Sequence, residues 1–175
     1  MPDVAEMVRS SGGMVWRTIC RLVGRADGEV EDCFQEVFVA AMEVGRRETV
    51  RNWEGMLRRI ATRKGLDLVR RRVRSKGQME EMDVGEVVGD AEGPGVALER
   101  EELAEGLRRA LAEVKPVEAE VFCLKHLEDL SYEEIGAVVG MSAGNVGVMI
   151  HRTKGRLREL MERRVGRQRS EVPHE

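Results

Sequence analysis

Four carboxylates in the first half of the chain are the side chains best placed for bond chemistry. Glu31, Asp32, Glu36 and Asp67 could supply the oxygen ligands of Mg²⁺ in a metal-dependent nuclease. Such a site needs carboxylates that converge on one point, and nothing in the sequence makes Asp67 face the other three. A nuclease is therefore the weakest of the alternatives for this chain.

The cysteines and histidines are not spaced for a metal site or a nucleophile. The three cysteines are odd in number, far apart and without a CxxC pair: Cys20, Cys33 and Cys123. We expect buried free thiols, with neither a disulfide framework nor a zinc site. The three histidines are also scattered, and we expect them at the surface or facing DNA. The sequence predicts no enzyme activity, no metal and no cofactor.

Length and composition indicate an all-α protein. The 175 residues allow one domain or two small ones, and only 3% of them are aromatic while 42% are hydrophobic. This balance suits small helical bundles better than a sheet sandwich. No apolar run approaches the roughly 18 residues of a membrane span, and the start of the chain has no signal-peptide pattern. We expect a cytoplasmic protein without membrane insertion.

A helix-turn-helix is the clearest motif. Ser131 and Glu134 form a capping box that should start a helix, and Gly140 can adopt the positive φ angle of a tight turn. Ser142 then caps a second helix, which Val146 anchors. The positions of this helix expected to face outward are Ser142, Ala143, Gly144, Gly147, Val148 and His151. A recognition helix meets the major groove in this way, although a purely structural helical hairpin shares part of the pattern.

Charge is strongly segregated, although the net charge is only −3. Residues 46–76 contain twelve Lys or Arg against three acidic residues, a balance of +9, whereas residues 77–105 contain ten Asp or Glu against one Arg, a balance of −9. A basic stretch ahead of a DNA-binding motif is the expected footprint of phosphate contact, although a solvated helix face would look similar.

The acidic stretch also predicts a boundary between two helical domains. Five glycines and Pro94 interrupt any helical period between residues 77 and 96, and the carboxylates there repel one another. We expect an N-terminal domain at 1–76, a flexible acidic linker at 77–102, a helix-turn-helix domain at 103–165 and a polar tail at 166–175.

Residues 31–42 should form a helix with two distinct faces. Its apolar positions recur at helical spacing and should face the core: Phe34, Val37, Phe38 and Ala41. Its other face is polar: Asp32, Gln35 and Glu36. Periodicity alone would leave this face as solvated surface, and a partner protein is the alternative.

These features together resemble a known family. The motifs occur in the order Asp32-x-x-Gln35-Glu36-x-Phe38, Trp53-x-x-x-Leu57-x-x-Ile60-Ala61, Asp67-x-x-Arg70-Arg71, Ser131-Tyr132-x-Glu134-Ile135, Gly140-x-Ser142 and His151-Arg152. In order, spacing and two-domain layout the chain resembles sigma-70 family sigma factors of the extracytoplasmic-function (ECF) group. The resemblance covers residues 14–76 and 103–161.

The resemblance implies a role for each charged surface. The face of Asp32, Gln35 and Glu36 would bind core RNA polymerase, which performs the catalysis. The residues implied in minus-ten promoter DNA binding are Arg46, Arg47, Arg51, Asn52, Trp53, Arg63, Lys64, Arg70, Arg71, Arg72 and Arg74. Those implied in minus-thirty-five binding are Ser142, Asn145, His151, Arg152, Lys154 and Arg156. The acidic linker would thread the polymerase channel, and an anti-sigma factor would be a further partner.

Two positions of the second helix depart from the family pattern. Gly147 and Met149 stand where many relatives carry Lys or Arg, so the long donors that pair with guanine are missing there. Direct base readout should therefore be limited. A stand-alone helix-turn-helix regulator remains the main alternative function, and it predicts a stable dimer that binds its operator without polymerase.

Overall fold

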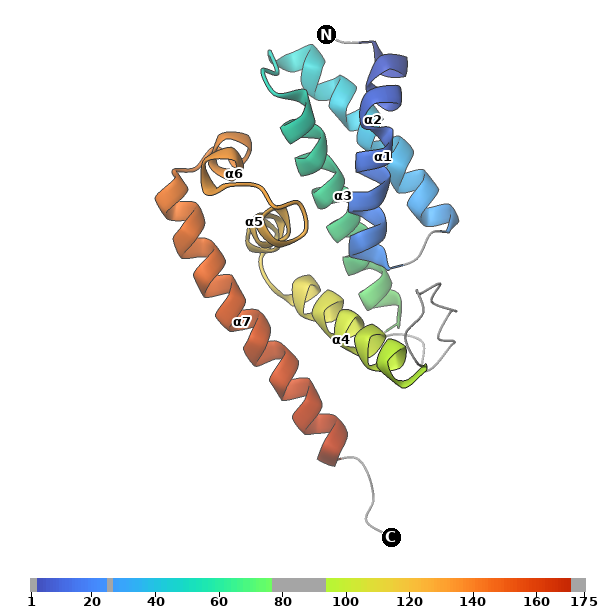
Figure 1. Cartoon of the computed structure of the whole chain (residues 1–175), viewed down its shortest axis with the longest axis vertical. Helices are drawn as coiled ribbons and strands as arrows, with labels where there is room; N and C mark the ends of the chain where they lie inside the picture. Colours follow the sequence, from blue (N-terminus) through green and yellow to red (C-terminus); the bar gives the residue numbers. More distant parts are fainter. Residues whose placement is uncertain (1–2, 25–26, 77–93, 171–175) are drawn as a thin grey trace.

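The computed structural model describes residues 3–24, 27–76 and 94–170. Within the last range, side chains are described for residues 98–163. The described residues form helices and connecting turns (Figure 1). The all-α prediction is confirmed. The helices are α1 (Val4–Val23), α2 (Gly28–Arg47), α3 (Trp53–Lys76), α4 (Pro94–Glu113), α5 (Pro116–His126), α6 (Tyr132–Val139) and α7 (Ala143–Ser170). None of the described helices is long and apolar enough to span a bilayer.

Helices α1, α2 and α3 pack together as an N-terminal bundle. The Asp27 carboxylate accepts a hydrogen bond from the Val30 amide at 3.2 Å and so caps α2. Val37 and Phe38 are buried, as the helical spacing predicts, and Phe34 joins Phe38 to the α1 ring of Trp16 through edge contacts. The opposite face of α2 stays exposed.

Helix α4 begins within the segment that the domain boundaries assign to the linker. Helix α4 starts at Pro94, so residues 94–102 are helical, although composition predicts that they belong to the linker. Proline suits the first turn of a helix because its missing N–H would have no partner there, which explains a start at a residue expected to interrupt helical structure. The remaining linker residues, 77–93, and the end of the tail lie outside the described residues.

The helix-turn-helix has a small core of its own. Val121 and Leu124 of α5 pack with Ile135 of α6 and with Val146 and Ile150 of α7. These five side chains are buried, and they hold the two helices of the motif against α5. The start of α7 is thereby fixed, while its other side remains open to solvent.

The two parts of the chain form one continuous structure, which charge patterning does not predict. Helix α3 contacts α4, α5 and α6 as well as α1 and α2 (Figure 1). Leu111 of α4, Cys123 of α5 and Leu157 of α7 belong to the same buried cluster as the N-terminal bundle. Residues far from the linker therefore hold the two parts together.

Candidate nucleic-acid and protein interfaces

The helix-turn-helix has the local geometry that the sequence predicts. The Ser131 hydroxyl accepts a hydrogen bond from the Glu134 amide at 3.1 Å, and the Glu134 carboxylate accepts one from the Ser131 amide at 2.8 Å. The hydrogen bond from the Ser131 amide to the Glu134 carboxylate, followed by the interaction with the Ser131 side chain, holds the pKa of Glu134 below its usual value. Gly140 has a φ of 76°, and the Ser142 hydroxyl accepts the Asn145 amide at 3.3 Å.

Gly136 fixes the sharpness of the turn. A Cβ atom at this position would lie 2.5 Å from the Met141 carbonyl oxygen, which is too close for any real side chain. The turn between α6 and α7 therefore crosses directly over Gly136. This approach sets the angle at which α7 leaves the motif.

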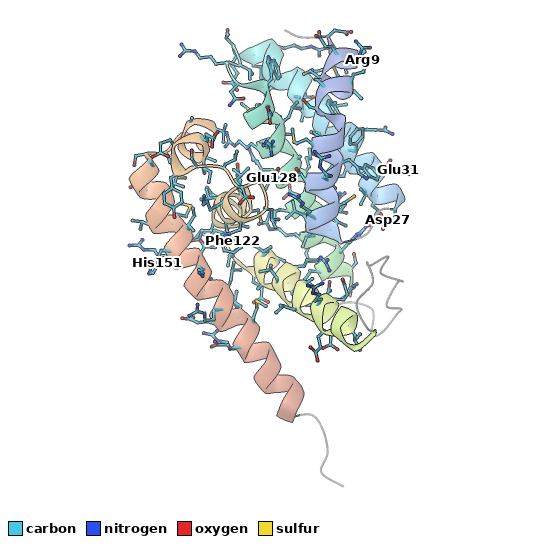
Figure 2. All side chains as sticks on the ribbon, viewed as in Figure 1. Arg9, Asp27, Glu31, Phe122, Glu128 and His151 are labelled. Atoms are coloured by element: carbon cyan, nitrogen blue, oxygen red, sulfur yellow. The ribbon has the colours of Figure 1, made fainter. Side chains whose placement is uncertain are left out.

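The start of α7 presents a polar and basic face to solvent. All six residues assigned to minus-thirty-five binding are exposed: Ser142, Asn145, His151, Arg152, Lys154 and Arg156. Figure 2 shows His151 on the outer side of α7, away from the other helices. Val148 lies among them and is 51% exposed, so one aliphatic side chain on this face is open to solvent.

Gly147 differs from its expected position. The helical period predicts the outward face for it, but it is half-buried, and a Cβ atom there would lie 3.3 Å from Cε2 of Tyr132. Tyr132 starts α6 and covers this point of α7. The local period of α7 alone cannot reveal a ring contributed by another helix.

The polar face of α2 is exposed as expected and lines a groove. Asp32, Gln35 and Glu36 border the groove, and Val39 contributes an apolar wall that is 51% exposed. Lys64 of α3 reaches the Glu36 carboxylate at 2.8 Å. This hydrogen bond lowers the pKa of Glu36, which favours the negatively charged form of that side chain.

The basic side chains of α3 do not share one environment. Arg63, Arg71 and Arg74 are exposed and could hold a phosphate backbone. The Arg72 side chain is only 18% exposed, and it pairs with Asp27 at 2.6 Å and with Glu29 at 2.8 Å. Its partners lie at the start of α2, so Arg72 fastens two helices of the bundle.

Arg70 is also enclosed, with a side chain that is 15% exposed and an Nη1–H that donates to Asp67 at 3.2 Å. Its Nη2 group is buried and has no hydrogen-bond partner among the described residues. Arg70 and Arg72 are thus poorer phosphate ligands in this conformation than their place in a basic run suggests.

The loop before α3 is open to solvent. Arg46, Arg47, Arg51 and Asn52 are exposed, whereas Trp53 is half-buried and packs on the core cluster. The Asn52 side-chain oxygen accepts the amide of Gly55 at 2.9 Å and caps α3. Asn52 therefore has a structural role besides the DNA contact that the resemblance implies.

Two buried carboxylates tie α5 and its following loop to the N-terminal bundle. Glu128, with a side chain 3% exposed, accepts hydrogen bonds from Arg58 at 2.8 Å and from Thr18 at 2.9 Å. Glu120 pairs with Arg59 at 2.7 Å. Figure 2 shows Glu128 between the C-terminal helices and the bundle. The sequence gives no sign of these pairs because their members are about 60 to 110 residues apart.

Two of the four carboxylates considered for a nuclease are engaged in other ways. Glu36 pairs with Lys64, and Asp67 pairs with Arg70. In the part of the chain that the structure describes, no group of three or more His, Cys, Asp or Glu side chains could hold a metal ion.

The chain is similar to one family model and to several characterised proteins. Residues 104–157 match the model for sigma-70 region 4. The chain is 34% identical to the ECF RNA polymerase sigma factor SigE of Mycolicibacterium smegmatis over 92% of its own length, but it spans only 62% of that protein. It is 34% identical to the ECF sigma factor ShbA of Streptomyces griseus, covering 81% of this chain and 76% of that one.

A third relative and two solved structures agree with these matches. The chain is 32% identical to the ECF sigma factor SigF of Caulobacter vibrioides, over 83% of this chain and 78% of SigF. Its fold is similar to that of the sigma factor RpoE of Bartonella quintana in complex with the anti-sigma factor NepR, at 18% identity and a TM-score of 0.53 over 90% of this chain and 96% of that one. CnrH in complex with the cytosolic domain of CnrY gives the same TM-score at 22% identity, over 91% and 87% of the two chains.

These matches agree with the order of motifs and with the geometry of the helix-turn-helix. Two of the relatives exceed 30% identity and are covered by this chain over more than three quarters of their length. The chain belongs to the ECF group of the sigma-70 family of RNA polymerase sigma factors.

Proposed function

We propose that the protein binds core RNA polymerase and directs it to promoters, as a non-catalytic initiation factor. One observation carries the proposal: a single chain of this family exposes an acidic groove on α2 and, on α7, the polar and basic face of a capped recognition helix. The first surface suits a basic protein partner, and the second suits duplex DNA. Neither surface needs bond chemistry of its own.

The α2 groove is our candidate for the polymerase contact. Asp32, Gln35 and Glu36 offer acceptors and negative charge, and Val39 offers an apolar contact at the same face. An interface usually combines an apolar centre with a polar rim. When polymerase binds, Lys64 would either release the Glu36 carboxylate or become part of the interface.

The loop before α3 and the exposed arginines of α3 are our candidates for the minus-ten contact. Arg46, Arg47 and Arg51 surround the approach to Trp53, and Arg63 lies further along α3. Opening a promoter costs a few kcal/mol for each unstacked base, and pocket contacts to such a base together with phosphate contacts can offset that cost. The half-buried Trp53 would support the pocket from the core side.

Engaging both promoter elements at once requires the two parts of the chain to separate. Elements centred near minus ten and minus thirty-five lie roughly 85 Å apart at about 3.4 Å per base pair. A Cβ at Gly55 of α3 would lie 3.0 Å from Val138 of α6, so the two DNA-binding parts touch in this structure. The ion pairs of Glu120 and Glu128 would therefore break on the promoter, which would release Arg59 from Glu120 and leave Arg58 paired with Glu54.

We further propose a cytoplasmic site of action and regulation by an anti-sigma factor. Of the two solved structures with a similar fold, one is a sigma factor in complex with an anti-sigma factor, and the other is CnrH with the cytosolic domain of CnrY. The exposed faces of α2 and α7 are the surfaces that an inhibitor of this chain would have to cover. Co-purification of a candidate inhibitor, and its loss of effect after charge reversal on α2, would test this point.

Binding to purified core polymerase tests the proposed function. We expect the protein to form a stable holoenzyme and to bind promoter DNA tightly only within it. The stand-alone regulator makes the opposite prediction, namely a dimer that binds a specific duplex without polymerase. Size-exclusion chromatography with core polymerase, followed by DNA binding with and without it, separates the two.

A further inference from the structure

The candidate DNA surface of α7 contains one exposed aliphatic side chain among polar and basic residues. Val148 is 51% exposed in the second turn of α7. Among the side chains of this helix that the structure describes, 143–163, the buried ones are Val146, Ile150, Thr153 and Leu157. At roughly 100° per residue, Val148 points about 200° away from Val146, so it faces directly outward from the core.

The surroundings of Val148 allow the helix to approach a groove closely. One turn earlier lies Gly144, where an added Cβ would meet no atom within 4 Å. The adjacent Gly147 is covered by the Tyr132 ring, so Gly144 is the glycine that leaves the backbone open next to Val148. Glycine permits a backbone to come near a ligand, and a side chain as short as valine reaches a base only from such a distance.

Valine can recognise one feature of a base edge in the major groove. It has no donor or acceptor, so it cannot read guanine, cytosine or adenine by hydrogen bonding. The C5-methyl group of thymine is the one apolar group exposed there, and apolar side chains pack against it. The N-terminal residues of a recognition helix are those that contact base edges.

We propose that Val148 determines specificity in the minus-thirty-five element by packing against a thymine methyl group. This inference rests on the proposed function. Gly147 and Met149 provide no long hydrogen-bond donors for reading base edges, and the apolar contact of Val148 would supply part of that recognition. His151 and Arg152, one turn further along the exposed face, would hold the phosphates beside this base pair. The upstream element would then be selected for thymine at one position.

Deoxyuridine provides a direct test because it differs from thymidine only by the missing methyl group. Promoters chosen by the holoenzyme from a randomised upstream library are made with each thymine, on either strand, replaced singly by uracil. Wild-type holoenzyme should lose roughly fourfold in affinity at one position, the value of one buried methyl group. Replacement at the other positions should change affinity little.

Three variants make the assignment specific. Val148→Ala should lower affinity for the thymine promoter by a similar factor and show no further loss with uracil. Arg152→Ala should weaken binding to both promoters equally, because a phosphate contact is insensitive to the base. Val8→Ala removes an exposed valine from α1, outside the helix-turn-helix, and should behave as wild type.

The outcomes separate this inference from the proposed function. A holoenzyme that initiates at promoters but does not distinguish thymine from uracil contradicts the role of Val148 alone. Persistence of the uracil effect in Val148→Ala also contradicts it, as does a loss in Val148→Ala that is the same for both bases. If no holoenzyme forms, the proposed function itself is wrong, and the role of Val148 falls with it.

Discussion

Individual charged residues on this protein differ in role even where they are neighbours in sequence. On α2, Asp32 and Glu36 are exposed at a groove and are not part of the buried core. Reversing both to Arg should raise the dissociation rate from core polymerase by placing like charges against a basic surface, while leaving the thermal midpoint nearly unchanged.

The control for this reversal carries the same charge change elsewhere. Glu159→Arg with Glu162→Arg alters two exposed residues of α7, far from the α2 groove. Pull-down with core polymerase should fall for the α2 variant and not for the α7 variant. Equal retention of both folded variants would remove the α2 groove from the proposed polymerase contact.

The arginines of α3 provide a second comparison at this scale. Replacing Arg63, Arg71 and Arg74 with Gln should lower holoenzyme affinity for promoter DNA. The salt dependence of binding should also fall, by about one unit of slope for each phosphate that the variant no longer neutralises. Arg72→Gln should instead lower the free energy of unfolding, because it breaks the pairs with Asp27 and Glu29.

Salt titrations and urea unfolding of the two variants check this division. If Arg72→Gln left stability intact but reduced the salt slope, the ion pairs with α2 would not hold in solution. The contrast matters because the run of arginines from 70 to 72 looks uniform in sequence.

The cysteines give a residue-scale prediction that follows from their pKa values. Burial raises the pKa of all three thiols, to about 11 at Cys33 and about 12 at Cys123, but the Cys20 side chain is partly exposed. Only the thiolate is reactive, so iodoacetamide at pH 8 should modify Cys20 first. Peptide mass spectrometry would follow each site, and rapid modification of Cys123 in the free protein would contradict the closed packing of α5 on α3.

At the scale of single elements, sequence patterns predict those features that depend on near neighbours. The capping box of Ser131 and Glu134 and the turn at Gly140 are predictable because their partners lie within a few residues. The apolar face of α2 is predictable for the same reason. The start of α4 at Pro94 is not, since proline permits a helix start as readily as it interrupts a helix.

The candidate site is predictable in outline and not in its long-range contacts. The exposed faces of α2 and α7 follow from helical period, and the structure bears out their exposure except at Ala143 and Gly147, which are half-buried. The contact of Tyr132 with Gly147, the enclosure of Arg72 and the pairs of Glu120 and Glu128 depend on the tertiary arrangement of different helices. No local pattern encodes such contacts.

The helix-turn-helix itself can be tested with two glycines. Gly136→Ala places a methyl group 2.5 Å from the Met141 carbonyl, so the turn must shift, and we expect a loss of roughly 1 to 3 kcal/mol in stability. Gly155→Ala meets no atom within 4 Å in an exposed part of α7 and should add roughly 0.5 to 1 kcal/mol.

Urea unfolding measures both substitutions under the same conditions. The change in the free energy of unfolding should have opposite signs in the two variants. The methyl group of Gly136→Ala meets the backbone of the turn, whereas that of Gly155→Ala points into solvent. An unchanged or increased stability of Gly136→Ala would mean that the turn is looser than its geometry indicates.

At the scale of the whole molecule, the structure is a closed form that the proposed function requires to open. Cys123 lies in the buried cluster that joins α5 to the N-terminal bundle, whereas Cys33 lies within the bundle itself. Binding to core polymerase and promoter should therefore speed alkylation of Cys123 and leave Cys33 protected. Cys33 serves as the internal control for general unfolding.

Removing the carboxylate charges that hold the closed form should shift the equilibrium between closed and open forms toward the open one. Glu120→Gln with Glu128→Gln removes the charges that Arg58 and Arg59 pair with, so Cys123 should react faster even without polymerase. If Cys123 remained protected both in this variant and in the promoter complex, separation of the two parts would be excluded as a step in initiation.

Run-off transcription tests the proposed role in initiation most directly. Core polymerase is incubated with a library of promoter fragments, with and without this protein, and the start sites are mapped. We expect new start sites only when both are present, with sequence preference at two elements roughly 25 base pairs apart, which matches the span of about 85 Å between contacts near minus ten and minus thirty-five. Absence of new start sites, together with specific duplex binding by the protein alone, would contradict this role.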